Sequence, residues 1–302
     1  MNRYEQGENP MDQNPWNRDH DISFLKIWDI EKGSAAVVKR FDYLIEAPNW
    51  SKDGKSLYFN SLGKIHRLTL DGGDMHEVCT GYADNCNNDH VLSPDGGQIA
   101  VSHGAREDGK SRIYVVDIAG GTPRLVTPPG PSYLHGWSPD GSTLAYCAER
   151  DGEYDVYTIP IQGGMETKLT HAKGLNDGPE YDPTGEFIWF NSVRSGLMQA
   201  WRMRRDGREQ TQMTFDETRN IWFPHISPDG EQVVLLAYKK GDLLPQEHLP
   251  HKRVDLCLMN ADGSDLQTLC TLFGGQGTVN VNSWSPDSKR FAFVSYELPN
   301  GI

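Results

Sequence analysis

The sequence lacks long apolar runs and basic clusters. No segment of its 302 residues approaches the roughly 18 apolar residues of a transmembrane helix, so we expect no membrane span. The 42 acidic residues outnumber the 29 basic ones, which gives a formal net charge of −13. Proteins that bind nucleic acids need a basic face, so no nucleic acid partner is expected. The acidic balance favours solubility.

Cysteine is also scarce, and the N-terminal segment has no apolar stretch. The five cysteines are odd in number and include no Cys-x-x-Cys pair, which argues against a disulfide framework or a zinc knot. Residues 1–21 are polar and lack the apolar region of a signal peptide. We therefore expect reduced thiols, a polar N-terminal extension over residues 1–21 and a cytoplasmic protein. A periplasmic or secreted location is the alternative if a leader has been removed.

Glycine and proline, by contrast, are abundant, with 31 and 18 residues, and many fall in a repeated turn. The turn reads Ser-Pro-Asp-Gly or a close variant, and an apolar residue precedes it in all six copies. Proline presets the first turn position, and Asp-Gly supplies the hydrogen-bonding and left-handed positions. Successive turns begin 42, 45, 44, 45 and 58 residues apart. The six copies occupy residues 51–54, 93–96, 138–141, 182–185, 227–230 and 285–288.

An apolar strand and then an outer hairpin follow most turns, so each repeat predicts four short strands. The apolar strands are expected at residues 56–60, 98–103, 143–148, 187–192, 233–238 and 291–296. Units of this length with four strands are typical of propeller blades. The last repeat has only two strands, and residues 24–40 form a hairpin without an inner pair. We therefore predict an all-β fold, a single six-bladed β-propeller over residues 22–302 whose sixth blade combines two strands from each terminus.

The longest spacing comes from an insertion in the fifth blade at about residues 239–254, which contains His248. It is either a lid over a site or a tolerated surface loop.

Three histidines precede the turns at nearly equivalent positions, where loops enter the inner strands and gather at one mouth of the ring. His90 and His135 lie three residues before the turn, and His225 lies two before it. Ten histidines in the whole chain would rarely place three there by chance. Convergent imidazoles favour a divalent transition metal. The alternative is that they line a water-filled funnel without a metal.

Other polar and aromatic residues near the same mouth extend the candidate site. Those on the entering loops are Asn88, Asp89, Glu180, Gln276, Asn280 and Asn282. Arg106, Arg150 and Arg194 recur after the second strands; they would suit a carboxylate ligand, but ties between neighbouring blades are the favoured interpretation. Tyr133 and Trp222 would stack on a sugar ring or pack between blades.

The Trp-Ser-Pro-Asp-Gly repeat, as in residues 137–141, resembles that of TolB-like β-propellers. Prolyl-oligopeptidase-type enzymes and oligogalacturonate lyases share it, and the resemblance covers the chain from about residue 22. No Gly-x-Ser-x-Gly elbow of an α/β-hydrolase occurs. Oligogalacturonate lyases hold manganese near the axis with histidines and a glutamine. Together with the convergent histidines, the resemblance favours a divalent metal (Mn, Zn or Ca) at His90, His135, His225 and Gln276. Only Gln276 matches the family's position, because Asn280 and Asn282 stand where that family has histidines.

Two functions are compatible with these features. The first is a soluble propeller that binds a small-molecule or oligosaccharide ligand, a sugar or uronate, in its axial funnel. If it is catalytic, the resemblance implies a metal-dependent lyase, in which a metal stabilises developing charge and a base removes a proton. Tyr133, Arg194 and His103 are candidates for the catalytic residues. The second is a non-catalytic TolB-like platform for a protein or peptide partner.

Overall fold

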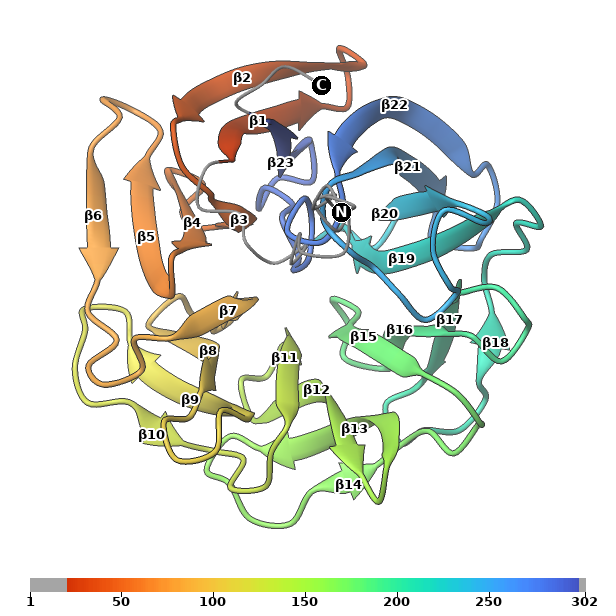
Figure 1. Ribbon diagram of the computed structural model, residues 1–302, viewed down its shortest axis with the longest axis horizontal. Coiled ribbons are helices and arrows are strands. Elements are labelled where there is room, and N and C mark those ends of the chain that lie inside the picture. The colour runs from red at the N-terminus through yellow and green to blue at the C-terminus, as the bar shows by residue number, and fades with distance from the viewer. Residues whose placement is uncertain (1–20, 299–302) are drawn as a thin grey trace, which may run out of the picture.

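The computed structural model describes residues 21–298, and its sheets form a ring of six antiparallel blades around a common axis (Figure 1). The predicted extension over residues 1–21 lies, apart from Asp21, outside the described residues. Blade 1 contains β3 (Glu46–Trp50), β4 (Ser56–Ser61), β5 (Lys64–Thr69) and β6 (Met75–Val78). Blade 2 contains β7 (Cys86–Leu92), β8 (Gln98–Gly104), β9 (Ser111–Asp117) and β10 (Arg124–Leu125). Blade 3 contains β11 (Ser132–Trp137), β12 (Thr143–Arg150), β13 (Glu153–Pro160) and β14 (Thr167–Lys168).

The remaining blades complete the ring in chain order. Blade 4 contains β15 (Asn176–Tyr181), β16 (Phe187–Ser192), β17 (Gln199–Arg204) and β18 (Thr211–Gln212). Blade 5 contains β19 (Arg219–Ile226), β20 (Gln232–Lys239), β21 (Lys252–Asn260) and β22 (Gln267–Gly274). Blade 6 contains β1 (Ile22–Asp29), β2 (Ser34–Phe41) and β23 (Arg290–Glu297). The predicted six-bladed propeller is therefore confirmed. No helix in the described part of the chain is long and apolar enough to cross a membrane.

Both ends of the described chain build blade 6, as predicted. Strand β1 pairs with β23 along its whole length, from Ile22 opposite Glu297 to Asp29 opposite Arg290. The expected fourth strand is irregular: it is reduced to a bridge between Trp284 and Phe291 and one further backbone hydrogen bond, from the Val294 N–H to the Thr278 carbonyl. Side chains from this segment bond instead to blades 2 and 5, which draws it away from regular pairing.

The repeated turn is held by one hydroxyl and one carboxylate. In blade 3, Ser138 Oγ donates to Asp140 Oδ1 at 2.6 Å and accepts from the Thr143 backbone N–H at 2.9 Å. Gly141 then adopts a φ of +74°, a region that glycine enters at little cost. Blade 4 exchanges the roles, because Thr184 Oγ1 donates to Asp182. This interchange explains why the repeat tolerates sequence variation.

The innermost strands are irregular where they approach the axis, and this positions the site. Register shifts occur in β3, β7, β11, β15 and β19. In three of them the residue before a proline has a left-handed backbone: Ala47, Gly178 and Phe223 have φ values of +53°, +58° and +53°. Such bulges bend a strand and redirect its side chains, so they set which residues point into the ring.

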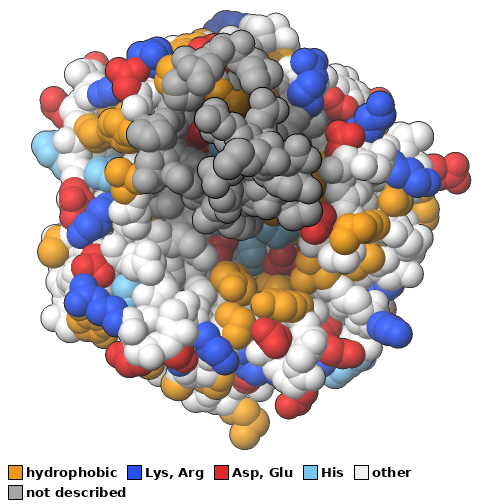
Figure 2. Space-filling view, in the orientation of Figure 1, with side chains coloured by type: hydrophobic (Ala, Val, Ile, Leu, Met, Phe, Trp, Pro, Cys, Tyr) orange, Lys and Arg blue, Asp and Glu red, His pale blue; other side chains and the backbone are white. Residues whose placement is uncertain are grey.

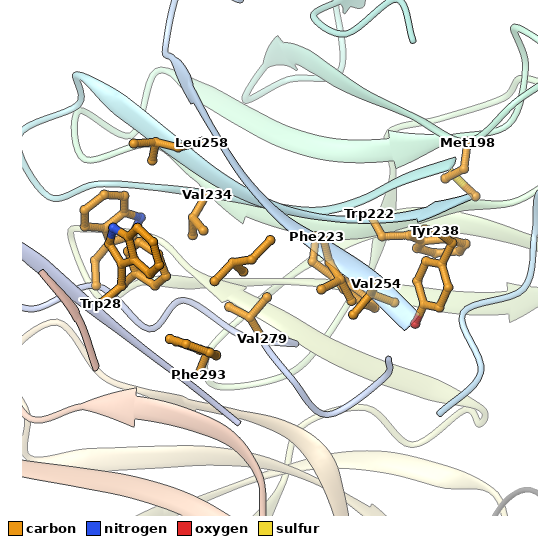
Figure 3. Packing of buried hydrophobic residues seen from close by; sticks show 14 residues of the cluster. Trp28, Met198, Trp222, Phe223, Val234, Tyr238, Val254, Leu258, Val279 and Phe293 are labelled. Atoms are coloured by element: carbon orange, nitrogen blue, oxygen red, sulfur yellow. The ribbon is translucent and has the colours of Figure 1, made fainter. Parts of the chain in front are cut away.

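Buried side chains fill the spaces between blades. A large cluster joins blades 4, 5 and 6 and includes Met198, Trp222, Phe223, Tyr238 and Val279 (Figure 3). The blade 5 insertion, residues 240–251, lies between β20 and β21, close to its predicted place. The core therefore reaches the inner strands and supports residues near the axis.

Candidate ligand-binding site

A cavity of about 620 Å³ lies among the inner strands of the ring. Figure 2 shows histidine and acidic side chains near the middle of one face, bordered by hydrophobic ones. The lining residues come from five blades or the segments that lead into them and, for blade 5, from its insertion. They are Leu44, Glu46, Asn87, Asn88, Asp89, Tyr133, His135, Cys147, Tyr154, Leu175, Asp177, Gln246, His248, Gln276 and Asn280. The cavity thus combines two tyrosines and a few apolar groups with many hydrogen-bonding side chains.

Asp177, at the start of β15, is the centre of one polar cluster. Its Oδ1 accepts from the Gly178 N–H at 2.7 Å and lies 3.2 Å from His135 Nε2 of the neighbouring blade. Its Oδ2 lies 3.8 Å from His248 Nε2 of the insertion. Burial opposes ionisation, but His135, His248 and the Gly178 N–H outweigh it and hold the pKa of Asp177 well below its usual range. Asp177 is therefore an ionised carboxylate at the cavity wall.

Asp89, on β7, forms the second cluster with two asparagines. Asn280 Nδ2 donates to Asp89 Oδ1 at 2.6 Å, and Asn87 Nδ2 donates to Oδ2 at 2.8 Å. Burial raises the pKa of Asp89 to about 6, against the opposing effect of His135, and the Asp177 charge adds to the rise. Asp89 therefore changes charge between pH 5 and 7.

The charges of both carboxylates, Asp177 and Asp89, act on His135. Burial alone would lower its pKa, but the hydrogen bond and charge of Asp177, together with the charge of Asp89, raise it. The pKa of His248 is lowered, because burial and the charge of His135 outweigh the attraction of Asp177. The cavity also contains Glu46, and none of the described residues that line it is Lys or Arg. The lining therefore carries more potential negative charge than positive charge.

The ring of Phe223 packs against three histidines in or near the cavity wall. The residue is buried and has a left-handed backbone, which is uncommon for a bulky residue. Its ring centroid lies 6.4 Å from that of His135, 6.5 Å from that of His225 and 5.4 Å from that of His248. One strained residue thus contacts histidines from blade 3, blade 5 and the insertion, which is a reason to look for function here.

Six of the residues expected from the sequence line the cavity, namely Asn88, Asp89, Tyr133, His135, Gln276 and Asn280. The others lie outside its lining. His103 Nδ1 accepts from the Asn85 N–H, and buried Trp222 packs its ring 4.5 Å from that of His248. Asn282 donates to Glu180 and to the Ile226 carbonyl.

The structure does not bring His90, His135 and His225 together around a metal. His90 is fully buried, with its ring beside the Ala47 and Tyr58 carbonyls, and burial lowers its pKa to about 4. His225 Nδ1 lies 2.6 Å from Glu180 Oε2, and its Nε2 lies 3.2 Å from the Val279 carbonyl, so both ring nitrogens are engaged. Within residues 21–298 no cluster of three His, Cys, Asp or Glu side chains could hold a metal ion. The expected ligands therefore do not fit a manganese centre.

Each repeated arginine bonds to its own blade or to the connection that leads into that blade from the preceding one, as Arg150 does with the Pro129 and Pro131 carbonyls. Arg106 pairs with Asp84, and Arg150 pairs with Glu166 at 2.7 Å. Arg194 donates to Ser192, Asn176 and Gln210, all in blade 4. The reason is that each outer hairpin or entering loop folds back over the end of its own second strand. Neither Arg150 nor Arg194 lines the cavity.

Sequence reasoning missed two residues that are central to the cavity, Asp177 and His248. Asp177 lies five residues before its turn, as Glu46 does, and each is followed by a left-handed residue and a proline. That repeated pattern was a usable signal. His248 had no such signal, because it lies in a segment that no other blade contains.

The family described as TolB beta propeller domain matches residues 105–247. An uncharacterized protein from Agrobacterium fabrum is 48% identical over 275 residues, which covers 91% of this chain and 92% of that protein. A solved structure from Agrobacterium tumefaciens, described as a candidate TolB, has a TM-score of 0.87 at 47% identity and covers 91% of this chain and 98% of its own. The likenesses to the two Agrobacterium proteins extend over nearly the whole propeller.

A more distant likeness is to a manganese complex of oligogalacturonate lyase. The TM-score is 0.53 at 13% identity, over 92% of this chain and 91% of the lyase. At that identity the likeness shows a shared fold, and it does not transfer the lyase's chemistry.

Proposed function

Because this chain belongs to the TolB-like β-propeller family, we propose that it uses the axial cavity of the ring to bind a small polar ligand. The observation that carries the proposal is the lining itself. Tyr133 and Tyr154 offer apolar ring surface, and Asp89, Asp177 and Asn280 offer hydrogen-bond acceptors. Small-molecule sites typically combine a mostly apolar wall with a few fixed polar groups. A hydroxyl-rich ligand such as a sugar suits this combination.

A uronate suits the cavity less well. Carboxylate ligands are usually held by Arg or Lys, whereas the described lining offers neither and contains Glu46, Asp89 and Asp177. The same carboxylates would oppose the enolate charge that forms during β-elimination, and the donor set does not fit a metal to offset it. We therefore propose binding without lyase chemistry. Incubation with oligogalacturonate, followed by the ultraviolet absorbance of an unsaturated product, tests the lyase alternative.

The binding proposal is tested by thermal shift and ligand-observed NMR with a panel of small polar compounds. A ligand present at 100 times its Kd stabilises a native protein by about 2.7 kcal/mol, so a true ligand raises Tm measurably. Asp177→Asn should abolish the shift, and Asp71→Asn should keep it, because Asp71 is exposed outside the cavity. Unchanged Tm and NMR spectra across the panel would contradict the proposal. Metal analysis of the purified protein, with His135→Ala as the comparison, separates direct ligand binding from metal-mediated binding.

A second candidate function is a platform for a protein or peptide partner. It is favoured by an exposed apolar side chain in the insertion: Leu244 is 57% exposed and is followed by the cavity-lining residues Gln246 and His248. A partner that binds the wild-type chain, but neither Leu244→Ser nor the chain saturated with a small ligand, would support this function. A partner indifferent to both changes would bind elsewhere.

We propose the cytoplasm as the compartment, in keeping with the free state of all five cysteines in the described part of the chain. Cell fractionation with an antibody tests this location.

A further inference from the structure

Asp177 has acceptor capacity directed at the cavity. A carboxylate offers about four lone-pair sites. The strong donors to Asp177, the Gly178 N–H and His135, both contact Oδ1, and the weakly donating Cys147 thiol adds a further bond to the carboxylate. The Oδ2 atom lies 3.8 Å from His248 Nε2, which exceeds hydrogen-bond length. A donor placed in the cavity would therefore complete the coordination of this oxygen.

Asn280 supplies an independent acceptor. It is only 1% exposed, it lines the cavity, and its Oδ1 is buried without a hydrogen-bond partner. Its amide orientation is defined by its neighbours, because Nδ2 lies 2.6 Å from Asp89 Oδ1 and 3.3 Å from Asn88 Oδ1, and both atoms are acceptors. Buried polar groups are nearly always paired, so an unpaired carbonyl oxygen at a cavity wall points to a ligand that donates.

The charge of the wall specifies the kind of donor. Asp89 and Asp177 are lining carboxylates, His135 and His248 are the titratable bases near them, and the described lining includes neither Lys nor Arg. A surface with more negative than positive charge attracts cations and repels anions. A neutral hydroxyl would satisfy the acceptors but would leave the excess negative charge uncompensated.

From these three observations we propose that the ligand of the axial cavity carries a primary ammonium group, bound by Asp89, Asp177 and Asn280. The inference rests on the proposed function and names its ligand class as small organic amines. Asp89 and Asp177 lie on blades 2 and 4, Asn280 lies on the segment that precedes β23, and all three line the same cavity. An ammonium group has three diverging donors that match such a set, whereas a planar guanidinium fork matches a single carboxylate.

The experiment compares matched compounds that differ in one group. D-Glucosamine is compared with D-glucose and D-glucuronate, and 1,4-diaminobutane with 1,4-butanediol and succinate. Binding to the full chain at pH 7.5 is measured by saturation-transfer difference NMR and by isothermal titration calorimetry. We expect an amine to bind at least tenfold more tightly than its hydroxyl counterpart, which is the scale of one charge-assisted hydrogen bond, and the carboxylates not to bind.

Variants then locate the binding. Asp177→Asn and Asp89→Asn, on different blades, should each weaken amine binding at least tenfold, while Asp71→Asn should not change it. Circular dichroism establishes that each variant is folded, and the two variants guard against the misfolding of one.

The outcomes separate the two proposals. Equal binding of hydroxyl or carboxylate compounds, lost in Asp177→Asn, would overturn the ammonium inference and leave the ligand-binding function standing. Amine binding that survives both cavity variants would also overturn the inference, because it would occur elsewhere. No binding by any compound would overturn both.

Discussion

His225 Nδ1 lies 2.6 Å from Glu180 Oε2, which joins a histidine of blade 5 to a carboxylate of blade 4 inside the ring. The other oxygen of Glu180 accepts from the Ile226 N–H at 3.1 Å and from Asn282 Nδ2 at 2.6 Å. One buried carboxylate therefore connects blades 4, 5 and 6. Because neither Glu180 nor His225 lines the cavity, we assign the pair to ring closure rather than to ligand binding.

Replacing Glu180 should therefore lower stability. Glu180→Ala leaves three donor groups, two of them buried, without their acceptor, and each buried loss costs about 1–3 kcal/mol. Allowing for relaxation, we expect the free energy of unfolding to fall by about 3 kcal/mol, as measured by urea denaturation. Glu186→Ala is the control, because the exposed side chain of Glu186 forms a surface ion pair with Arg204 at 3.4 Å, and its loss should change stability by less than about 0.5 kcal/mol. Equal effects of the two variants would mean that the network does not hold the blades together.

The fold could be predicted from the sequence because the same turn motif, one for each blade, occurs six times. The Ser and Asp of each turn bond to one another and to the next strand, so the chemistry that defines the turn is local and visible in the sequence. The irregular inner segment of blade 6 could not be predicted in the same way. Its hydrogen bonds run to Asp89 and Glu180, residues about 190 and 100 positions away, and no local pattern encodes such contacts.

The site was predicted only in part, for a related reason. Equivalent positions in the repeats identified Asp89, His135 and Asn280, which line the cavity. The same reasoning expected His90 and His225 to face the axis, but a shift of one residue in a strand changes the face on which a side chain lies. The bulges in β7 and β19 introduce such shifts, and their extent depends on packing that a single sequence does not show.

The close approach of blades 3 and 4 predicts a large effect at Gly136. A Cβ added there would lie 2.7 Å from the Pro179 carbonyl oxygen and 3.2 Å from Glu180 Cα, so Gly136→Ala must push the blades apart. We expect a loss of about 3 kcal/mol in urea denaturation, with weaker ligand binding because His135 is the preceding residue. Gly230→Ala is the matched control: its φ is +77° but nothing lies within 4 Å of the added Cβ, so strain alone should cost about 1 kcal/mol. A control as damaging as Gly136→Ala would contradict the packing argument.

The ring of Phe223 should hold the blade 5 insertion in place. It lies 5.4 Å from the ring of His248 and is 1% exposed, so Phe223→Ala removes this support and leaves a cavity. We expect a loss of about 3–4 kcal/mol and faster amide hydrogen exchange across residues 240–251, measured by mass spectrometry. Phe215→Ala serves as the comparison, since Phe215 is 74% exposed and should affect neither quantity. Unchanged exchange in the insertion would show that Phe223 does not support it.

The raised pKa of Asp89 predicts that the effect of its removal on stability depends on pH. Its folded-state pKa is about 6, above the ordinary value of 3.8 for an aspartate side chain. The native state therefore binds the proton more tightly than the unfolded state, and Asp89 becomes increasingly destabilising as the pH rises from about 4 to above 6. The difference corresponds to roughly 2–3 kcal/mol. The amide of Asp89→Asn places a donor against Asn280 Nδ2 or Asn87 Nδ2, which costs stability at every pH. We therefore expect the effect of Asp89→Asn on the free energy of unfolding to become more favourable by about 2–3 kcal/mol between pH 4 and pH 7.5, with urea denaturation at several pH values as the measurement.

A bound cation should reverse this effect, which links the pH dependence to the proposed ligand. An ammonium group beside Asp89 favours its ionised form, so a saturating amine should stabilise the wild-type chain more at pH 7.5 than at pH 5. In Asp89→Asn much of this pH dependence should disappear, whereas Asp71→Asn should retain it. A gain in stability that is the same at both pH values in the wild-type chain would show that the amine does not bind next to Asp89. In the free protein, keeping the buried Asp89 carboxylate ionised lowers stability. An organic cation that binds beside Asp89 would offset this loss of free energy.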